Sequence, residues 1–408
     1  GITPKLAVKV DERVKAGTTL FYAKDHPEIL FSSPVSGVVA EIERGEKRRI
    51  LNIVIKADKE IEYEDFGVKK VSSLSPEDVK QSILDAGIWY LIKQRPYDVV
   101  AVPGKDPRDI FVTGFDSAPL APSYDFMLEG QEADLQAGLD ALAKLTKGKV
   151  YLSISAKTKS KALREAKNVV ITEFNGPHPA GNVGVQINHI KPVNRGEVVW
   201  TLNAMDAVLI GRLFNSGHVD LTRTVALCGS EVKQTGYYKI LVGTELNSIF
   251  KGNVTEGISL RYISGNPLTG RKIDGNGVLR AYDSQVTVIP EGDDVHEAFG
   301  WASLSPKRYS SGGTYLKHNR KYRLDARLLG GPRAIIVSNE YDKVFPMDIF
   351  PEQLIKATLA FNIDKMEQLG IYEVAPEDFA LCEFVDTSKL EIQRIIRTGL
   401  DLLRSEME

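Results

Sequence analysis

The stretch that decides the fold runs from residue 132 to residue 172 and reads EADLQAGLDALAKLTKGKVYLSISAKTKSKALREAKNVVIT. Its first part predicts an amphipathic helix over 132–147, because leucines recur on one face, and Gly148 is placed to end it. A strand over Val150–Ser155, a helix over Lys157–Lys167 and a strand over Asn168–Thr172 follow. Strands that alternate with helices favour a parallel sheet with right-handed crossovers.

Both flanks extend this α/β pattern. Ser75-Pro76-Glu77-Asp78 has the residues of a helix start, since serine caps, proline suits the first turn and acids suit the positive end of the helix dipole. Gly87 is placed to end that helix, and Ile110–Thr113 reads as a strand. Beyond the deciding stretch, a strand over Val198–Leu202 precedes a helix around Ala204–Phe214 that Gly217 ends.

The ends of the chain have a different character. Residues 4–56 read as short strands and tight turns, with Gly17 and Gly37 at turns that need positive φ, which suggests a small barrel or sandwich. Residues 224–288 return to short β runs with one helical turn, a pattern that resembles a β-grasp. From Pro351 onward helices return, and the last one carries an apolar stripe made by Leu390, Ile392, Ile395, Ile396, Leu400 and Leu403.

Composition limits the classes of function. With 408 residues the chain is long enough for two to four domains, and 43% hydrophobic with 26% charged residues excludes disorder. Lys plus Arg is 52 and Asp plus Glu is 54, so the formal net charge is −2. A chain this balanced has no global field that would attract nucleic acid or anionic lipid, although a local basic patch remains open.

Motifs for common cofactors are missing from the sequence. The two cysteines, Cys228 and Cys382, stand too far apart in sequence for metal-ligand spacing, and they suggest a reducing compartment. No Gly-x-Gly-x-x-Gly run follows a strand, and no Walker loop or Gly-x-Ser-x-Gly elbow is present. The longest stretch without charged residues, Phe174–Ile190, is rich in Gly, Pro, Asn and His and predicts a loop rather than a membrane span. No signal peptide is visible.

The run Gly176-Pro177-His178-Pro179-Ala180-Gly181 is the most unusual segment of the chain. Two prolines fix the backbone around one histidine, and glycines permit the close approach of another chain or ligand. The segment is therefore either a rigid connector from sheet to helix or a preorganised contact surface, and the residues alone leave both open. If Gly181 needs positive φ, Gly181→Val would destabilise the loop.

Several runs are similar to the A-subunit family of Na⁺-translocating NADH:quinone reductases. They are Gly45–Arg49, Phe174–Gly181, Val199–Leu202, Asp206 with Ile210–Phe214, Phe299–Ala302 and Met347–Pro351. The first segment also resembles biotinyl and lipoyl domains, at Val10–Leu20 and Ser33–Val39, but the neighbours of Lys24 do not match a carrier lysine. The resemblance implies about 40 further residues before Gly1.

The resemblance implies a fold class of multidomain α/β plus β, related to RnfC and to the flavin subunit of respiratory complex I. The expected domains are a barrel-sandwich hybrid (1–60), a Rossmann-like α/β domain (72–217), a β-grasp domain of the soluble-ligand-binding type (220–295), a β and loop connection (296–345) and a C-terminal helical domain (346–408).

Departures from those relatives bear on cofactors. The flavin subunits hold FMN with a Gly-rich loop, and here that place reads Gly87-Ile88-Trp89-Tyr90-Leu91, so bulky residues would fill the flavin volume. The relatives also carry clustered cysteines for iron–sulfur clusters, whereas Cys382 stands alone. The resemblance with these departures implies a chain that binds no cofactor, in a complex that uses NADH, flavins, iron–sulfur centres and quinone in other subunits.

The resulting hypothesis is a peripheral subunit on the cytoplasmic side of a bacterial inner membrane. It would contribute to quinone reduction coupled to Na⁺ export and would be inactive alone, with no catalytic or metal-ligating residue of its own. Its partners would be the other subunits, with quinone as a further candidate ligand and no nucleic acid. The candidate docking or quinone loop comprises Gly176, Pro177, His178, Pro179 and Gly181. The alternatives are an RnfC-like flavin and iron–sulfur subunit, and a pure assembly platform.

Overall fold

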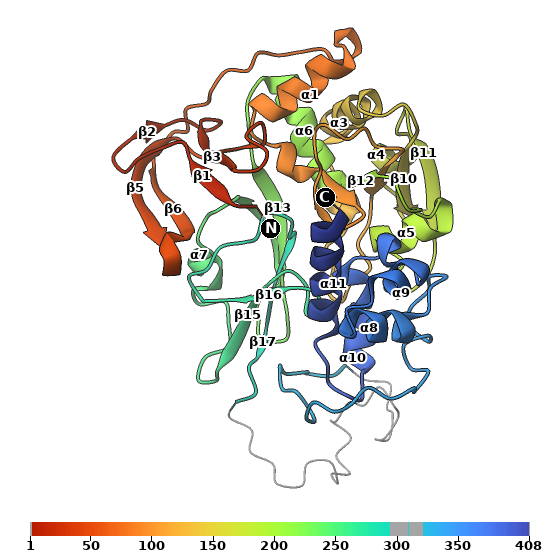
Figure 1. The fold of residues 1–408 in the computed structure, drawn as a ribbon. Coiled ribbons are helices and arrows are strands. Elements are labelled where there is room, and N and C mark those ends of the chain that lie inside the picture. Colours follow the sequence, from red (N-terminus) through yellow and green to blue (C-terminus); the bar gives the residue numbers. More distant parts are fainter. Residues whose placement is uncertain (1, 294–308, 310–320, 408) are drawn as a thin grey trace. The chain divides into compact units, whose positions relative to one another are not determined.

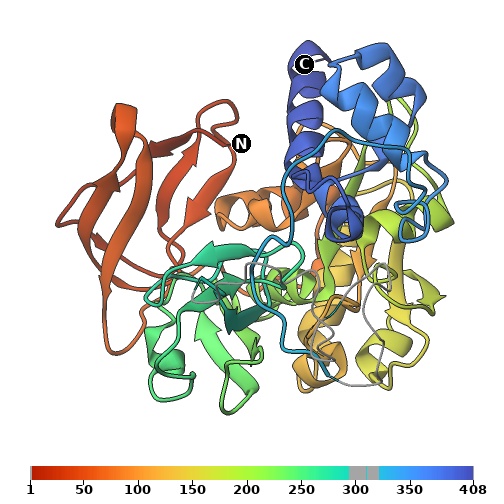
Figure 2. The ribbon, with the colours of Figure 1, turned by 90° about the horizontal axis from the view of Figure 1, so that it is seen from below.

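A computed structural model describes residues 2–293, 309 and 321–407, so the run Phe299–Ala302 lies outside the described residues. The chain forms two compact units. The first comprises Gly1–Asp116, Ser123–Thr222 and Tyr372–Val374, and the second comprises Ser117–Pro122, Arg223–Ile371 and Ala375–Glu408. Figure 1 follows the elements along the chain, and Figure 2 views them from below.

The first unit begins with a pair of three-stranded antiparallel sheets. One has the order β1 (Pro4–Leu6), β3 (Thr19–Ala23), β4 (Leu30–Ser32), and the other β2 (Arg13–Val14), β5 (Gly37–Arg44), β6 (Ile50–Ala57). Their shared core consists of Val8, Val14, Leu20 and Val39. Gly17 has φ 102°, and a Cβ on Gly37 would lie 2.2 Å from the carbonyl oxygen of Lys56, so both predicted glycine positions are confirmed.

The six-stranded sheet of the first unit confirms the parallel arrangement predicted from the sequence. Its order is β11 (Val170–Phe174), β10 (Val150–Ser155), β9 (Ile110–Thr113), β12 (Val199–Asn203), β7 (Lys93–Arg95), β8 (Val99–Val100). The first four strands are parallel, whereas β7 pairs antiparallel with β12 and with β8.

The helices in the described part of this unit connect and cover these strands. They are α1 (Pro76–Asp85), α2 (Tyr124–Met127), α3 (Glu132–Lys144), α4 (Lys161–Arg164), α5 (Val183–Ile190) and α6 (Ala204–Ser216). As predicted, Ser75 caps the start of α1 and Gly87, at φ 67°, follows its end. Gly217, at φ 74°, ends α6. The connection through α3 leads from β9 to β10, its neighbour on the β11 side. The connection through α5 leads from β11 in the opposite direction, to β12 on the other side of β9. Right-handed crossovers therefore place α3 and α5 on opposite faces of the sheet.

Two helix predictions need correction. Helix α3 ends at Lys144 rather than at residue 147, and Gly148 serves another purpose: a Cβ there would lie 1.9 Å from the carbonyl oxygen of Arg108. The helix expected over Lys157–Lys167 is only the single turn α4, because hydrogen bonds of Lys159, Arg164 and Lys167 hold the flanking residues in irregular structure.

The second unit contains a five-stranded sheet followed by helices. The strand order is β14 (Gly236–Leu241), β13 (Thr222–Cys228), β17 (Gln285–Pro290), β15 (Leu260–Ser264), β16 (Arg271–Ile273), with β13 parallel to β17 and with α7 (Asn247–Phe250) packed on the core. The later helices are α8 (Pro351–Leu359), α9 (Ile363–Gln368), α10 (Ala380–Val385) and α11 (Ile392–Met407).

The apolar stripe of the last helix is confirmed in part. Ile392, Ile396, Leu400 and Leu403 are buried, but Leu390 precedes the helix and donates its backbone N–H to Asp386.

The architecture is a mixed α/β fold of several sheets and helices. None of the helices in the described parts of the chain has the length and apolar character needed to span a bilayer.

Candidate functional site at the carboxyl ends of the parallel strands

The parallel strands β9, β10, β11 and β12 all end at one edge of the six-stranded sheet. The chain passes from β9 to β10 to β11 and then returns to β12, on the other side of β9. Doubly wound sheets bind ligands at the carboxyl edge where the strand order reverses in this way. The loop 176–181 follows β11 directly and therefore begins at this edge.

The loop presents its first two residues to solvent and buries its last ones. Gly176 and Pro177 are exposed, His178 is half-buried, and Pro179 and Gly181 are buried. The backbone N–H of Ala180 donates to Pro177 at 3.0 Å and that of Asn182 to Pro179 at 2.9 Å, so two successive turns shape the loop. The loop is accordingly less exposed than the sequence suggested, since only its outer half is available for contact.

Side chains from β9 and α5 fix the inner half of the loop. The hydroxyl of Thr113, the last residue of β9, lies 3.2 Å from the carbonyl oxygen of Gly181. The Gln186 amide donates to that hydroxyl at 3.0 Å and to the carbonyl of Ala180 at 3.3 Å. Because Gln186 is fully buried, these bonds are shielded from water and hold the loop against the sheet.

The backbone argument for Gly181 is wrong. Its φ does not lie in the left-handed region, because the residue continues the turn that leads into α5. Gly181 instead contributes through its buried position and through the carbonyl oxygen next to Thr113.

The electrostatics of His178 restrict its chemistry. Burial lowers the pKa of His178 to about 4, so the imidazole is neutral at pH 7. A neutral imidazole carries one donor and one acceptor nitrogen, and it suits hydrogen bonding better than binding of an anion. Within the described residues, no group of three or more His, Cys, Asp or Glu side chains is arranged to hold a metal ion.

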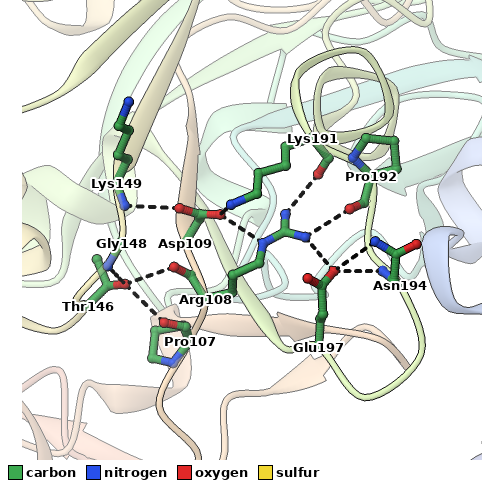
Figure 3. A network of polar contacts seen from close by, with 10 residues as sticks. All are labelled: Pro107, Arg108, Asp109, Thr146, Gly148, Lys149, Lys191, Pro192, Asn194 and Glu197. Carbon is green, nitrogen blue, oxygen red and sulfur yellow. Dashed lines mark hydrogen bonds and ion pairs between the residues drawn. The ribbon is translucent and has the colours of Figure 1, made fainter.

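A network of charged residues lies at the opposite, amino-terminal edge of the sheet (Figure 3). The Arg108 guanidinium donates to the Asp109 carboxylate at 2.8 Å, to the Glu197 carboxylate at 2.5 Å, and to the carbonyls of Lys191 and Pro192 at 2.8 and 2.9 Å. It therefore holds the connection between α5 and β12 against the start of β9.

Asp109 is the buried centre of this network. It accepts hydrogen bonds from the Lys191 ammonium at 2.8 Å and from the backbone N–H of Lys149 at 3.0 Å, in addition to the one from Arg108. Burial acts to raise the pKa of Asp109, but the hydrogen bonds from Lys191, Lys149 and Arg108 outweigh it and keep that pKa below its usual range. Because Arg108, Asp109, Lys191 and Glu197 each have a charged partner within the network, we interpret it as a structural clamp.

Sequence reasoning missed this clamp. Arg108 and Asp109 stand in the run Lys-Asp-Pro-Arg-Asp before β9, which reads as a polar loop, and their partners follow about 40 to 90 residues later. The available signal was an Arg-Asp pair immediately before a buried strand, a position where a charge needs a partner.

The residues proposed to replace the flavin loop lie in the interior. Trp89 and Leu91 are fully buried and Tyr90 is nearly so. The Trp89 indole donates to the carbonyl of Ala101 at 2.8 Å and packs edge-on against Trp200, with ring centroids 5.3 Å apart. This segment is part of the packed core of the first unit and does not fit a flavin.

Both cysteines are free and buried. Burial raises the pKa of the Cys228 thiol, although hydrogen bonds with Thr287 and Gln285 oppose the shift. Burial also raises the pKa of the Cys382 thiol, far above its ordinary value, with nearby carboxylates of Asp342, Asp378 and Asp386 adding to it. Thiols of this kind are poor nucleophiles and poor metal ligands at neutral pH.

Comparison with known proteins matches three segments of the chain to one family. Three family models match: an NqrA N-terminal barrel-sandwich hybrid domain at residues 1–58, an NqrA second alpha/beta domain at 74–219, and an NQRA C-terminal domain at 224–275. The A subunit of the Na⁺-translocating NADH-quinone reductase from Serratia proteamaculans is 36% identical over 414 residues, which cover 100% of this chain and 92% of that protein. The chain belongs to this A-subunit family, NqrA.

Other members give the same result. The NqrA protein of Neisseria meningitidis is 34% identical and that of Yersinia pseudotuberculosis 35% identical, each with 100% of this chain and 92% of the relative covered. The matches also support the barrel-sandwich form of the N-terminal domain. A solved structure of an NAD⁺-reducing [NiFe]-hydrogenase covers 81% of this chain and 61% of its own at 13% identity, with a TM-score of 0.41, which is too distant to support an argument.

Proposed function

We propose that the chain is the peripheral NqrA component of a membrane complex that transfers electrons from NADH to quinone and moves Na⁺ outward. The observation that carries this proposal is similarity over the full chain to proteins of that family, at 34 to 36% identity. The partners are the other subunits of the complex. The proposed location is the cytoplasmic side of a bacterial inner membrane.

The finer fold assignments form part of the same proposal. The six-stranded sheet carries helices on both faces, which supports a Rossmann-like domain over 72–217. The mixed five-stranded sheet packed with α7 supports a β-grasp domain over 220–295, and α8 to α11 support a helical domain over 346–408. The N-terminal domain would span 1–60, and a connection would span 296–345.

The chain is proposed to work without a flavin or an iron–sulfur cluster of its own. The support is the packed interior formed by Trp89, Tyr90 and Leu91, together with two buried, separate thiols at Cys228 and Cys382. Flavins, iron–sulfur centres and the NADH site would then belong to other subunits. An absorbance spectrum of the purified chain tests this directly, since a flavin band near one equivalent would favour the RnfC-like alternative.

Loop 176–181 is the proposed contact of this chain with its partners or with quinone. A docking segment gains from rigidity because it loses little entropy on binding, and the bonds through Thr113 and Gln186 supply that rigidity. Gly176 and Pro177 form the outward part, and the half-buried, neutral His178 lies beside them.

Washed membranes from cells that carry variants of this chain test the loop. His178→Ala and Pro177→Asp should each lower the amount of chain retained, or lower Na⁺-dependent quinone reduction, while the isolated chain still folds. Lys147→Ala is the matched control, because that side chain is 95% exposed on the same domain. Normal retention and turnover in both loop variants would reduce the loop to a connector.

The experiment also separates the second candidate, a pure assembly platform. A platform would lose retention in the loop variants but would show no change in turnover per retained chain. Quinone titration of the purified complex then distinguishes the two, since a quinone-binding chain would change the apparent affinity for quinone when the loop is altered.

A further inference from the structure

The hairpin of β5 and β6 ends in a cluster of cations that the proposed function does not use. Arg44, Lys47, Arg48 and Arg49, here called the cationic tip, are all exposed where β5 turns into β6. Figure 1 shows this turn at the far end of β5. Within the described residues, none of the four side chains forms an ion pair, and Glu46 is the one acid among residues 44–49.

The backbone of the turn is unusual for residues of this kind. Lys47 has φ 54° and ψ 29°, Arg48 has φ 60°, and the N–H of Arg49 donates to the carbonyl of Glu46 at 3.1 Å. Two central residues with positive φ are the property of the type I′ hairpin turn, which strongly prefers Asn-Gly. Long cationic side chains therefore occupy positions where the backbone favours other residues, and such strain points to function.

Apolar side chains lie beside the cations. Leu51 is 56% exposed, and its methyl groups lie across the hairpin at Gly45, where a Cβ would be 3.1 Å away. Val54, further along β6, is also exposed. Cationic side chains around an exposed aliphatic one match the boundary between lipid headgroups and acyl chains, because the charges reach phosphates while the apolar group enters the hydrocarbon.

We propose that the cationic tip binds the anionic phospholipid surface of the membrane, with Leu51 inserted between the headgroups. This goes beyond the proposed function, in which protein subunits hold the chain at the membrane. It would be an additional contact that supports this attachment. Single-stranded nucleic acid is a poor match, because the hairpin from Gly37 to Ala57 has no aromatic residue on which bases could stack.

The contact must be local to work. The chain as a whole carries a net charge of −2, so it has no long-range attraction to an anionic surface. Screening confines the field of the tip to about one Debye length, roughly 10 Å at moderate salt. Each cation near an anionic surface strengthens the partition of the chain from solution onto the membrane roughly fivefold. Four cations, opposed by Glu46, therefore give a weak contact that reinforces docking to protein subunits.

Vesicle sedimentation of the full chain tests the proposal. At low salt the chain should sediment with vesicles of phosphatidylcholine and phosphatidylglycerol, and it should stay in solution with phosphatidylcholine alone or at roughly 0.5 M salt. Lys47→Gln with Arg48→Gln should weaken the partition roughly 25-fold. Leu51→Ser should weaken it further, in a manner that does not depend on salt.

Two further variants keep the test independent of folding and of overall charge. Lys47→Asn with Arg48→Gly removes both cations but installs the sequence that the turn prefers, so it should fold well and still lose binding. Lys147→Gln with Lys167→Gln makes the same change of charge at exposed positions of the α/β domain and should leave the partition within about twofold.

Three outcomes would overturn the proposal. One is no sedimentation of the unaltered chain with anionic vesicles at low salt. A second is equal loss in the control pair, which would show a response to net charge alone. The third is unaltered vesicle binding in the tip variants; if those variants are also lost from the isolated complex, the tip binds an acidic protein partner instead.

Discussion

Gly138 of α3 and Gly211 of α6 lie backbone against backbone. A Cβ on Gly211 would be 2.8 Å from the amide nitrogen of Gly138 and 1.7 Å from the carbonyl oxygen of Asp134, and a Cβ on Gly138 would be 1.9 Å from the carbonyl oxygen of Ala207. The two helices therefore approach one another at a distance that only glycine permits. This pair of helices follows strands β9 and β12, which flank the reversal of strand order.

Gly211→Ala should lower the free energy of unfolding by about 1–3 kcal/mol, because the added methyl group forces the helices apart. At an unstrained position the same substitution stabilises a protein by about 0.4–1 kcal/mol, so the sign itself is informative. Chemical denaturation measures the effect. Gly104→Ala is the control, since a Cβ there has nothing within 4 Å. A stabilised Gly211→Ala variant would mean that α3 and α6 are not in close contact.

Asp109→Asn should destabilise the first unit by about 2–3 kcal/mol at pH 7, because the amide cannot replace the charged hydrogen bonds from Arg108 and Lys191. The pKa of Asp109 is lower in the folded state, so the carboxylate contributes stability above the unfolded-state pKa of about 3.9 and loses it as the pH falls further. The free energies of unfolding of the unaltered chain and of Asp109→Asn, measured by denaturation, should therefore converge as the pH falls below about 4.

Asp106→Asn is the matched control for this clamp. Asp106 lies three residues before Asp109, its side chain is 75% exposed, and its ion-pair partner, Lys147, is 3.9 Å away. Its substitution should change stability by less than about 0.5 kcal/mol. Equal losses in both variants would show that the effect is one of net charge and not of the buried centre.

His178→Gln should change the dependence of stability on pH. The pKa of His178 is lowered from 6.5 to about 4 by burial, so the unfolded chain takes up a proton at this residue before the folded chain does. The unaltered protein therefore loses stability as the pH falls from about 6.5 to about 4, and a variant without the imidazole avoids this loss. Melting temperatures measured between pH 7 and pH 4.5 should diverge, and parallel profiles would contradict the burial of the ring.

The sequence predicted the parallel sheet because its signals are local. The leucines of α3, the apolar run of β10 and the serine cap of α1 each act within a few residues, so a single chain reveals them. The glycines at positions 17, 37, 87 and 217 were likewise recognised, since each turn or helix end imposes its own backbone requirement.

The remaining features depend on residues distant in sequence. The clamp around Asp109 joins β9 to segments about 40 and about 80 residues later, and no local pattern announces such pairs. Gly148 was assigned to a helix end, but it is required by the approach of Arg108. The loop 176–181 was recognised as unusual, but the burial of its second half follows from contacts with Thr113 and Gln186. Its role as a docking or quinone site stays a prediction.

Lys47→Asn with Arg48→Gly should raise the free energy of unfolding, although it removes two charged residues from the cationic tip. Asparagine and glycine adopt positive φ with little strain, whereas lysine at φ 54° and arginine at φ 60° do not. Relief at the two positions should amount to about 1–2 kcal/mol, measured by denaturant titration of the isolated chain. Lys56→Gln, on the adjoining strand, should change little. If the double variant is less stable than the unaltered chain, the turn is not strained, and cations at these positions need no functional explanation.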